Sequence, residues 1–106
     1  MKAYKVTVSP DAKEDLRKAL WYLKYVLKNP QAARNVMDDY IETRKTLSRS
    51  AGSIQIPDQS SILGRRNLRR INFAKHDSFM LFRVEGDEVI ITNLFHGLED
   101  FENKLR

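Results

Sequence analysis

The chain has 106 residues, which suits a single domain with one hydrophobic core, so we expect residues 1–106 to form one domain. Its composition, 42% hydrophobic and 31% charged, excludes wholesale disorder. The lack of cysteine excludes a disulfide scaffold, thiolate metal sites and cysteine catalysis, and it favours a reducing compartment such as the cytoplasm. The net charge of +5 favours an anionic partner. No stretch approaches the length of a membrane span, and no membrane partner is expected.

The N-terminal half predicts a strand followed by two helices. Residues 4–8 alternate between apolar and polar side chains, which is typical of a half-buried strand. Ser9-Pro10 then predicts a helix start, and Asn29-Pro30 predicts a second one, because serine and asparagine cap helices and proline suits the first helical position. The two helices are separated by only two or three residues. We therefore expect an antiparallel helical hairpin.

Both helices carry apolar positions at helical spacing. The positions are Leu16, Leu20, Leu23 and Leu27 in the first helix, and Ala33, Val36, Met37, Tyr40 and Leu47, interrupted by Arg44, in the second. The first helix also carries a cluster of aromatic residues, Trp21, Tyr22 and Tyr25. We expect these rings to belong to the core and rim of the hairpin rather than to a platform for stacked bases.

The C-terminal half predicts an irregular segment, 51–64, with apolar anchors at Ile54, Ile56, Ile62 and Leu63, and then strands at 68–73, 79–84 and 89–95. A helix is expected from residue 97 onward. The predicted order is β-α-α-β-β-β-α, an α+β fold with the helical hairpin packed on a largely antiparallel sheet. The first strand should pair with the later ones. Strand 79–84 is apolar on both faces, so its second face needs a cover from the C-terminal helix or from a partner.

Positive charge is concentrated between residues 65 and 83, where six cationic side chains outnumber the single aspartate by five. The cationic residues are Arg65, Arg66, Arg69, Arg70, Lys75 and Arg83. The first five are our candidates for binding a target or nucleic acid, because guanidinium groups fit phosphate oxygens. Since side chains alternate along a strand, Arg69 and Arg70 should lie on opposite faces. The alternative is a solvated strand end that pairs with carboxylates of the helices.

Histidine is the natural general acid or base near neutral pH, and this chain has two. His96 ends the last strand, and His76 lies in a turn; His96 is the stronger candidate. His96 and Glu99 alone do not make a metal site, so no metal site is predicted, and no cofactor is expected because the chain lacks a phosphate-binding glycine loop. Acidic residues gather around residues 85–88 and 99–102, which makes the molecule dipolar.

Several motifs, taken together and in this order, make the sequence similar to the RelE/ParE toxins of bacterial and archaeal type II toxin–antitoxin modules. The similarity is carried by residues 4–16, the helical hairpin, Arg69-Arg70-Ile71-Asn72, Phe79-Met80-Leu81-Phe82-Arg83-Val84 before a Gly-Asp turn, and Leu94-Phe95-His96-Gly97-Leu98-Glu99-Asp100-Phe101. The resemblance spans the whole chain. It implies a toxin that is neutralised by a cognate antitoxin, whose extended or helical segment wraps around it.

Members of this family differ in activity: the RelE and YoeB branch cleaves mRNA on the ribosome, and the ParE branch inhibits DNA gyrase. For cleavage, the resemblance implies His96, Arg70 and Arg83 as catalytic candidates. Phe79, however, occupies a position where such nucleases carry a catalytic arginine, and Gly97 replaces the aromatic residue after the histidine. These departures favour a ParE-like inhibitor of gyrase. The alternatives are a ribosome-dependent mRNA endonuclease and a nucleic-acid-binding module without toxicity.

Overall fold

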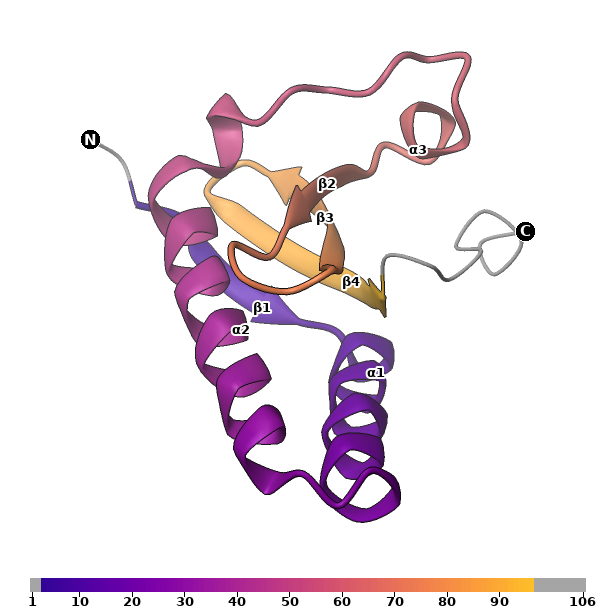
Figure 1. The fold of residues 1–106 in the computed structure, drawn as a ribbon. Helices are drawn as coiled ribbons and strands as arrows, with labels where there is room; N and C mark the ends of the chain where they lie inside the picture. The colour runs from indigo at the N-terminus through magenta and orange to yellow at the C-terminus, as the bar shows by residue number, and fades with distance from the viewer. Residues whose placement is uncertain (1–2, 97–106) are drawn as a thin grey trace.

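The computed structural model describes residues 3–96 and confirms the α+β class. In chain order the elements are β1 (Lys5–Val8), α1 (Pro10–Trp21), the π-helical turn η1 (Tyr22–Val26), α2 (Pro30–Ser50), the 3-10 turn η2 (Ala51–Ser53), α3 (Ile62–Arg65), β2 (Arg69–Asn72), β3 (Ser78–Glu85) and β4 (Glu88–His96) (Figure 1). The predicted C-terminal helix lies outside the described residues. Among the described residues, none of the helices is long and apolar enough to cross a bilayer.

Both predicted helix starts are confirmed. The Ser9 hydroxyl accepts a hydrogen bond from the backbone N–H of Ala12 at 3.1 Å, and Pro10 opens α1. The Asn29 side chain accepts from the N–H of Ala32 at 3.1 Å at the start of α2. Each cap gives an acceptor to a helical N–H that has no partner within its own helix. These local signals set where the hairpin begins and where it turns.

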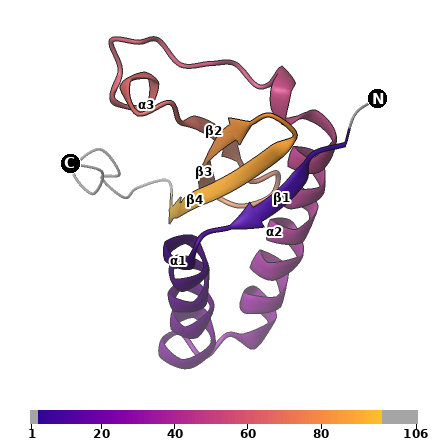
Figure 2. The same cartoon turned by 180° about the vertical axis from the view of Figure 1, so that it is seen from behind.

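The four strands form one sheet in the order β1-β4-β3-β2. The pairs β2–β3 and β3–β4 are antiparallel, and β1 runs parallel to β4, with Val6 opposite Val89 (Figure 2). The prediction that the first strand pairs with the later ones is therefore confirmed. A two-residue turn at Gly86-Asp87 joins β3 to β4, and Gly86 adopts a φ of +60°, which glycine tolerates without strain.

The two helices pack against one face of the sheet, which we call the helix face; the opposite face is the outer face. The main core on the helix face comprises Ala12, Val36, Tyr40, Leu47, Ala51, Phe73, Met80, Phe82, Val89, Ile91 and Leu94. A second, smaller cluster on the outer face comprises Leu68, Phe79, Leu81 and Phe95, with Leu63 of α3 packed against it. Phe79 and Leu81 are buried. The C-terminal helix expected to cover this face lies outside the described residues, so that expectation stays a prediction.

The end of the hairpin differs from the sequence prediction. The α-helix ends at Trp21, and the chain continues through η1, where the N–H of Leu27 donates to the carbonyl of Tyr22, five residues back. Leu27 is exposed rather than part of the apolar stripe. Trp21, Tyr22 and Tyr25 are also at least half exposed, so these rings lie at the rim of the hairpin and not in its core.

The irregular segment is anchored at fewer points than its sequence suggests. Ile54 packs against the main core and Leu63 against the outer cluster, whereas Ile56 is exposed. The loop ends in α3, where the buried Gly64 packs against the backbone of Asp58.

Substituting Gly64 with alanine is expected to destabilise the protein by about 1–3 kcal/mol, because a Cβ atom there would overlap the backbone carbonyl of Asp58, which cannot move as a side chain can. Gly52→Ala is the matched control. Its Cβ would meet only the tip of the Tyr4 side chain, which can rotate away. Urea unfolding of both variants, followed by circular dichroism, measures the difference. Equal stability of the two variants would contradict this view of the loop.

Candidate functional site

Arg70 occupies the outer face near the edge of the sheet. Its guanidinium carbon lies 3.8 Å from the centroid of the Phe79 ring, a cation–π contact, and its Nε donates to Oδ1 of Asn72 at 2.8 Å. Arg70 is exposed, while the ring beneath it is buried. The ring and the amide hold the guanidinium in place and leave its outer side open to solvent, where it can meet an anionic group.

Arg83 lies on the same face as Arg70, because it follows Leu81 by two positions on β3 and Leu81 is the cross-strand partner of Arg70. The Nε atom of Arg83 lies 3.6 Å from Oε1 of Glu85. This buried nitrogen makes no hydrogen bond within the described part of the chain. The two arginines therefore occupy neighbouring, diagonal positions on the outer face.

Arg69 points to the helix face, as the alternation along the strand predicted. Its Nη1 lies 3.3 Å from the carbonyl oxygen of Ala51 and 3.4 Å from that of Ile54, so the guanidinium donates to carbonyls just past the end of α2. A cation is favourable there because a helix C-terminus carries partial negative charge. Arg69 thus has a structural role that accounts for its position.

The remaining basic candidates lie in two other places. Arg65 is in α3, and its Nη1 donates to the carbonyl of Ser60 at 2.7 Å, while Arg66 caps the same short helix and is exposed. Lys75 is exposed in the turn between β2 and β3. The structure therefore divides the basic segment among α3, the outer face, the end of α2 and a turn, and it does not gather these residues into one patch.

His96 ends β4 and lies on the helix face. It pairs with Ser78 across the strands, and its Nδ1 is 3.5 Å from the Ser78 hydroxyl, whereas the preceding Phe95 belongs to the outer cluster. His96 lines a groove of about 590 Å³ between α1 and β4, together with Glu14 and Lys18. The three catalytic candidates are therefore not brought together, since Arg70 and Arg83 lie on the opposite face of the sheet.

The most elaborate polar arrangement involves a residue that sequence reasoning missed. Asp39 of α2 is only 4% exposed, and its carboxylate accepts three hydrogen bonds from the turn between β2 and β3. The donors are the backbone N–H of Ala74 at 3.2 Å, the N–H of Lys75 at 2.9 Å and Nδ1 of His76 at 2.7 Å. An acidic residue between the apolar positions Val36 and Tyr40 was the signal that could have indicated it.

This arrangement determines the charge state of Asp39. Burial alone would raise the pKa of the carboxyl, but the hydrogen bonds from His76, Lys75 and Ala74 outweigh it and hold the pKa of Asp39 below its usual value. Ionised Asp39 therefore fastens the turn to α2. His76 also borders an open groove of about 1130 Å³ between α2 and the edge of the sheet. Among residues 3–96, no group of three histidine or acidic side chains is placed to hold a metal ion.

The protein has the fold of a chain in the solved structure described as the chromosomal ParDE TA system from P. aeruginosa, with a TM-score of 0.69 and 22% sequence identity over 89% of this chain and 96% of that one. The fold is therefore RelE/ParE-like, as the sequence motifs predicted. The solution structure of the conserved hypothetical protein HP0894 from Helicobacter pylori also matches, with a TM-score of 0.46 and 19% identity over 91% and 97% of the two chains. No protein-family model and no curated protein sequence matches the chain.

Proposed function

We propose that this protein is the toxin of a toxin–antitoxin module, that it arrests growth without cutting RNA, and that its target is DNA gyrase. The fold shared with a chain of the ParDE system supports the toxin assignment, together with the ordered motifs of the sequence. The neighbour's description names a toxin–antitoxin system, and we extend that description to this chain as a hypothesis.

The separation of the candidate catalytic residues is the observation that carries the mechanistic part of the proposal. Cleavage of RNA requires a general acid or base and a phosphate-binding cation on either side of one reacting phosphate, within hydrogen-bond reach of it. His96 lies on the helix face of the sheet, and Arg70 lies on the outer face. Their placement on opposite faces supports inhibition by binding rather than cleavage.

We further propose that the neutralising antitoxin is acidic where it contacts the outer face. Arg70 is exposed there, and Arg66 of the adjoining segment is exposed as well. Because the apolar side chains beneath them are already buried, charge pairing and hydrogen bonding to these guanidinium groups, rather than apolar cover, would provide the recognition.

Induced expression without an antitoxin tests this function. Growth should stop, DNA synthesis should fall before protein synthesis, and the His96→Ala variant should arrest growth as strongly as the wild type. Separate incorporation of labelled thymidine, uridine and amino acids gives the order of events. Arrest of protein synthesis first, with cuts in translated messages that disappear in His96→Ala, would instead establish the ribosome-dependent nuclease. Unimpaired growth would favour a nucleic-acid-binding module.

A further inference from the structure

The far end of the helical hairpin, residues 21–28, exposes an unusual amount of apolar surface, and we call this segment the hairpin tip. Five of its large apolar side chains are about half exposed. They are Trp21 at 52%, Tyr22 at 50%, Tyr25 at 57%, Val26 at 49% and Leu27 at 54%. Single exposed apolar residues are ordinary, but five within seven positions concentrate apolar surface at one end of the hairpin, as interaction sites do.

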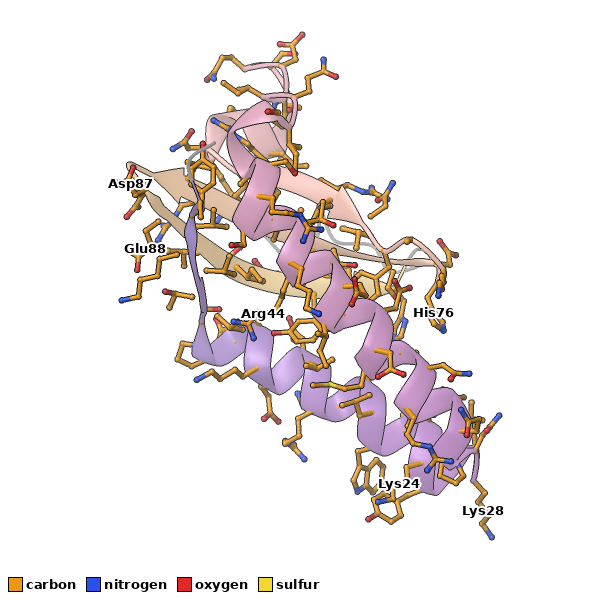
Figure 3. The ribbon with its side chains drawn as sticks, turned by 90° about the vertical axis from the view of Figure 1, so that its left-hand side faces the viewer. Lys24, Lys28, Arg44, His76, Asp87 and Glu88 are labelled. Carbon is orange, nitrogen blue, oxygen red and sulfur yellow. The ribbon has the colours of Figure 1, made fainter. Side chains whose placement is uncertain are left out.

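The hairpin tip lies in a region that contains cationic side chains and no acidic ones. Residues 16–37 hold five lysines and arginines and not a single aspartate or glutamate. Lys24 and Lys28 extend from the tip, and Asp87 and Glu88 lie at the opposite end of the molecule (Figure 3). Lys24 Nζ is 5.3 Å from the Tyr25 ring centroid, so this positive charge lies directly beside the aromatic surface. A partner for this surface must be both apolar and anionic.

The backbone of the tip departs from regular helical geometry. Tyr22–Val26 form a π-helical turn, a rare conformation that is frequent at functional sites. Lys28, just after this turn, has a φ of +52°, and the N–H of Asn29 donates to the carbonyl of Leu23 at 2.9 Å, a cap that commonly ends helices. This cap turns the chain sharply and leaves the Lys28 side chain exposed at the end of the hairpin.

The shape of the tip favours a protein as the partner. The hairpin projects away from the sheet, so its end is convex and suited to entering a cleft (Figure 1). Beside Trp21, a shallow cleft of about 370 Å³ between the helices is floored by apolar residues such as Leu20 and Met37 and rimmed by Lys24 and Arg34. This cleft can accept an apolar side chain of the partner protein. Tryptophan, tyrosine and arginine are the residues that most often dominate binding energy in protein interfaces.

Two other anionic partners fit the tip less well. Nucleic acid could stack on the aromatic rings, but the exposed aliphatic side chains of Val26 and Leu27 contribute nothing to stacking on bases. An anionic membrane surface would attract the lysines. However, the tip carries two lysines, fewer than the roughly four to eight basic residues of a typical lipid-binding cluster.

We propose that the hairpin tip is the surface with which this protein engages its target, by entering an apolar cleft rimmed by carboxylates on a protein. The inference rests on the proposed toxin function and assigns the target surface within it. In this arrangement the antitoxin binds the outer face, where Arg70 lies. Docking buries the exposed rings of the tip and brings Lys24 and Lys28 against acidic side chains of the target.

Charge reversal at the tip tests the proposal in cells that contain no antitoxin. Lys24→Glu/Lys28→Glu should restore colony formation after induction by about a hundred-fold, because each introduced glutamate then faces a carboxylate of the target. The matched control, Lys13→Glu/Lys45→Glu, changes the same charge at exposed positions away from the tip and should remain toxic. Tyr25→Ser/Leu27→Ser removes apolar surface without changing charge and should also restore growth. Circular dichroism and thermal melting confirm that each variant folds.

Toxicity of both tip variants, alongside a toxic wild type, overturns the inference and leaves the proposed function intact. A wild type that does not arrest growth overturns the proposed function and the inference with it. Trp21 is the only tryptophan, so its fluorescence reports on the tip directly. A shift of its emission on adding single-stranded oligouridylate or phosphatidylglycerol vesicles, lost in Lys24→Glu/Lys28→Glu, would assign the tip to nucleic acid or lipid and overturn the proposal.

Discussion

Replacing Phe82 with alanine should lower the free energy of unfolding by about 3–5 kcal/mol, the largest effect of any single substitution that we expect. Phe82 is completely buried at the centre of β3 and packs in the main core between the sheet and the helices. Alanine removes most of the ring and leaves a cavity that the surrounding sheet cannot close, because β3 is held by strands on both sides. Chemical denaturation followed by circular dichroism measures the change.

Two further variants serve as comparisons for Phe82→Ala. Phe82→Leu keeps most of the apolar volume and should be clearly less destabilising than Phe82→Ala. Ile56→Ala truncates a large apolar side chain that is 58% exposed, and it should change stability by no more than about 0.5 kcal/mol. Similar losses for Phe82→Ala and Ile56→Ala would contradict the position of the core described above.

Replacing Asp39 with alanine should destabilise the protein by about 3 kcal/mol, because it leaves the backbone N–H groups of Ala74 and Lys75 and the ring of His76 without their acceptor. His76→Ala should cost less, since it removes a single hydrogen bond and spares the two backbone donors. Asp38→Ala, the exposed neighbour on the same helix, is the control and should be nearly neutral. An effect of Asp39→Ala no larger than that of Asp38→Ala would refute a structural role for the carboxylate.

The same carboxylate predicts a pH dependence. The pKa of Asp39 is lower in the folded state than in the unfolded chain, so its ionised form contributes stability above about pH 4, the ordinary aspartate value. That contribution should be lost as the pH falls through the lowered, folded-state pKa. The stability difference between the wild type and Asp39→Asn, measured by urea unfolding between pH 7 and pH 2, should therefore shrink at acidic pH. A difference that stays constant would contradict this.

Local signals predicted the elements well because their physical causes are local. A cap such as Ser9 or Asn29 acts within three residues of its own position, and the turn at Gly86 depends on one backbone conformation. The alternation of Arg69 and Arg70 between faces follows directly from strand geometry. The end of the first helix was harder to predict, since the π-helical turn leaves Leu27 exposed at a position that helical periodicity assigns to the apolar stripe.

Features that depend on distant contacts could not be predicted from the sequence. Asp39 and His76 are 37 residues apart, and each looks like an ordinary surface residue until the turn is folded against α2. The contacts of the individual basic side chains could not be predicted for a similar reason. Their charges are close in sequence, but α3, β2 and the following turn point them in different directions. The exposed surface of the hairpin tip likewise follows from how the helices diverge from the sheet (Figure 1).

The parallel pairing of β1 with β4 also constrains how the chain can be made. Lys5 lies opposite Glu88, so the first strand finds its place only beside the last one, with the whole hairpin and both other strands synthesised in between. Contacts so far apart in sequence are slow to form, and domains generally fold as units during synthesis. A nascent chain lacking β4 has no partner for β1 and cannot close its main core. This topology delays closure of the main core until β4 has been synthesised.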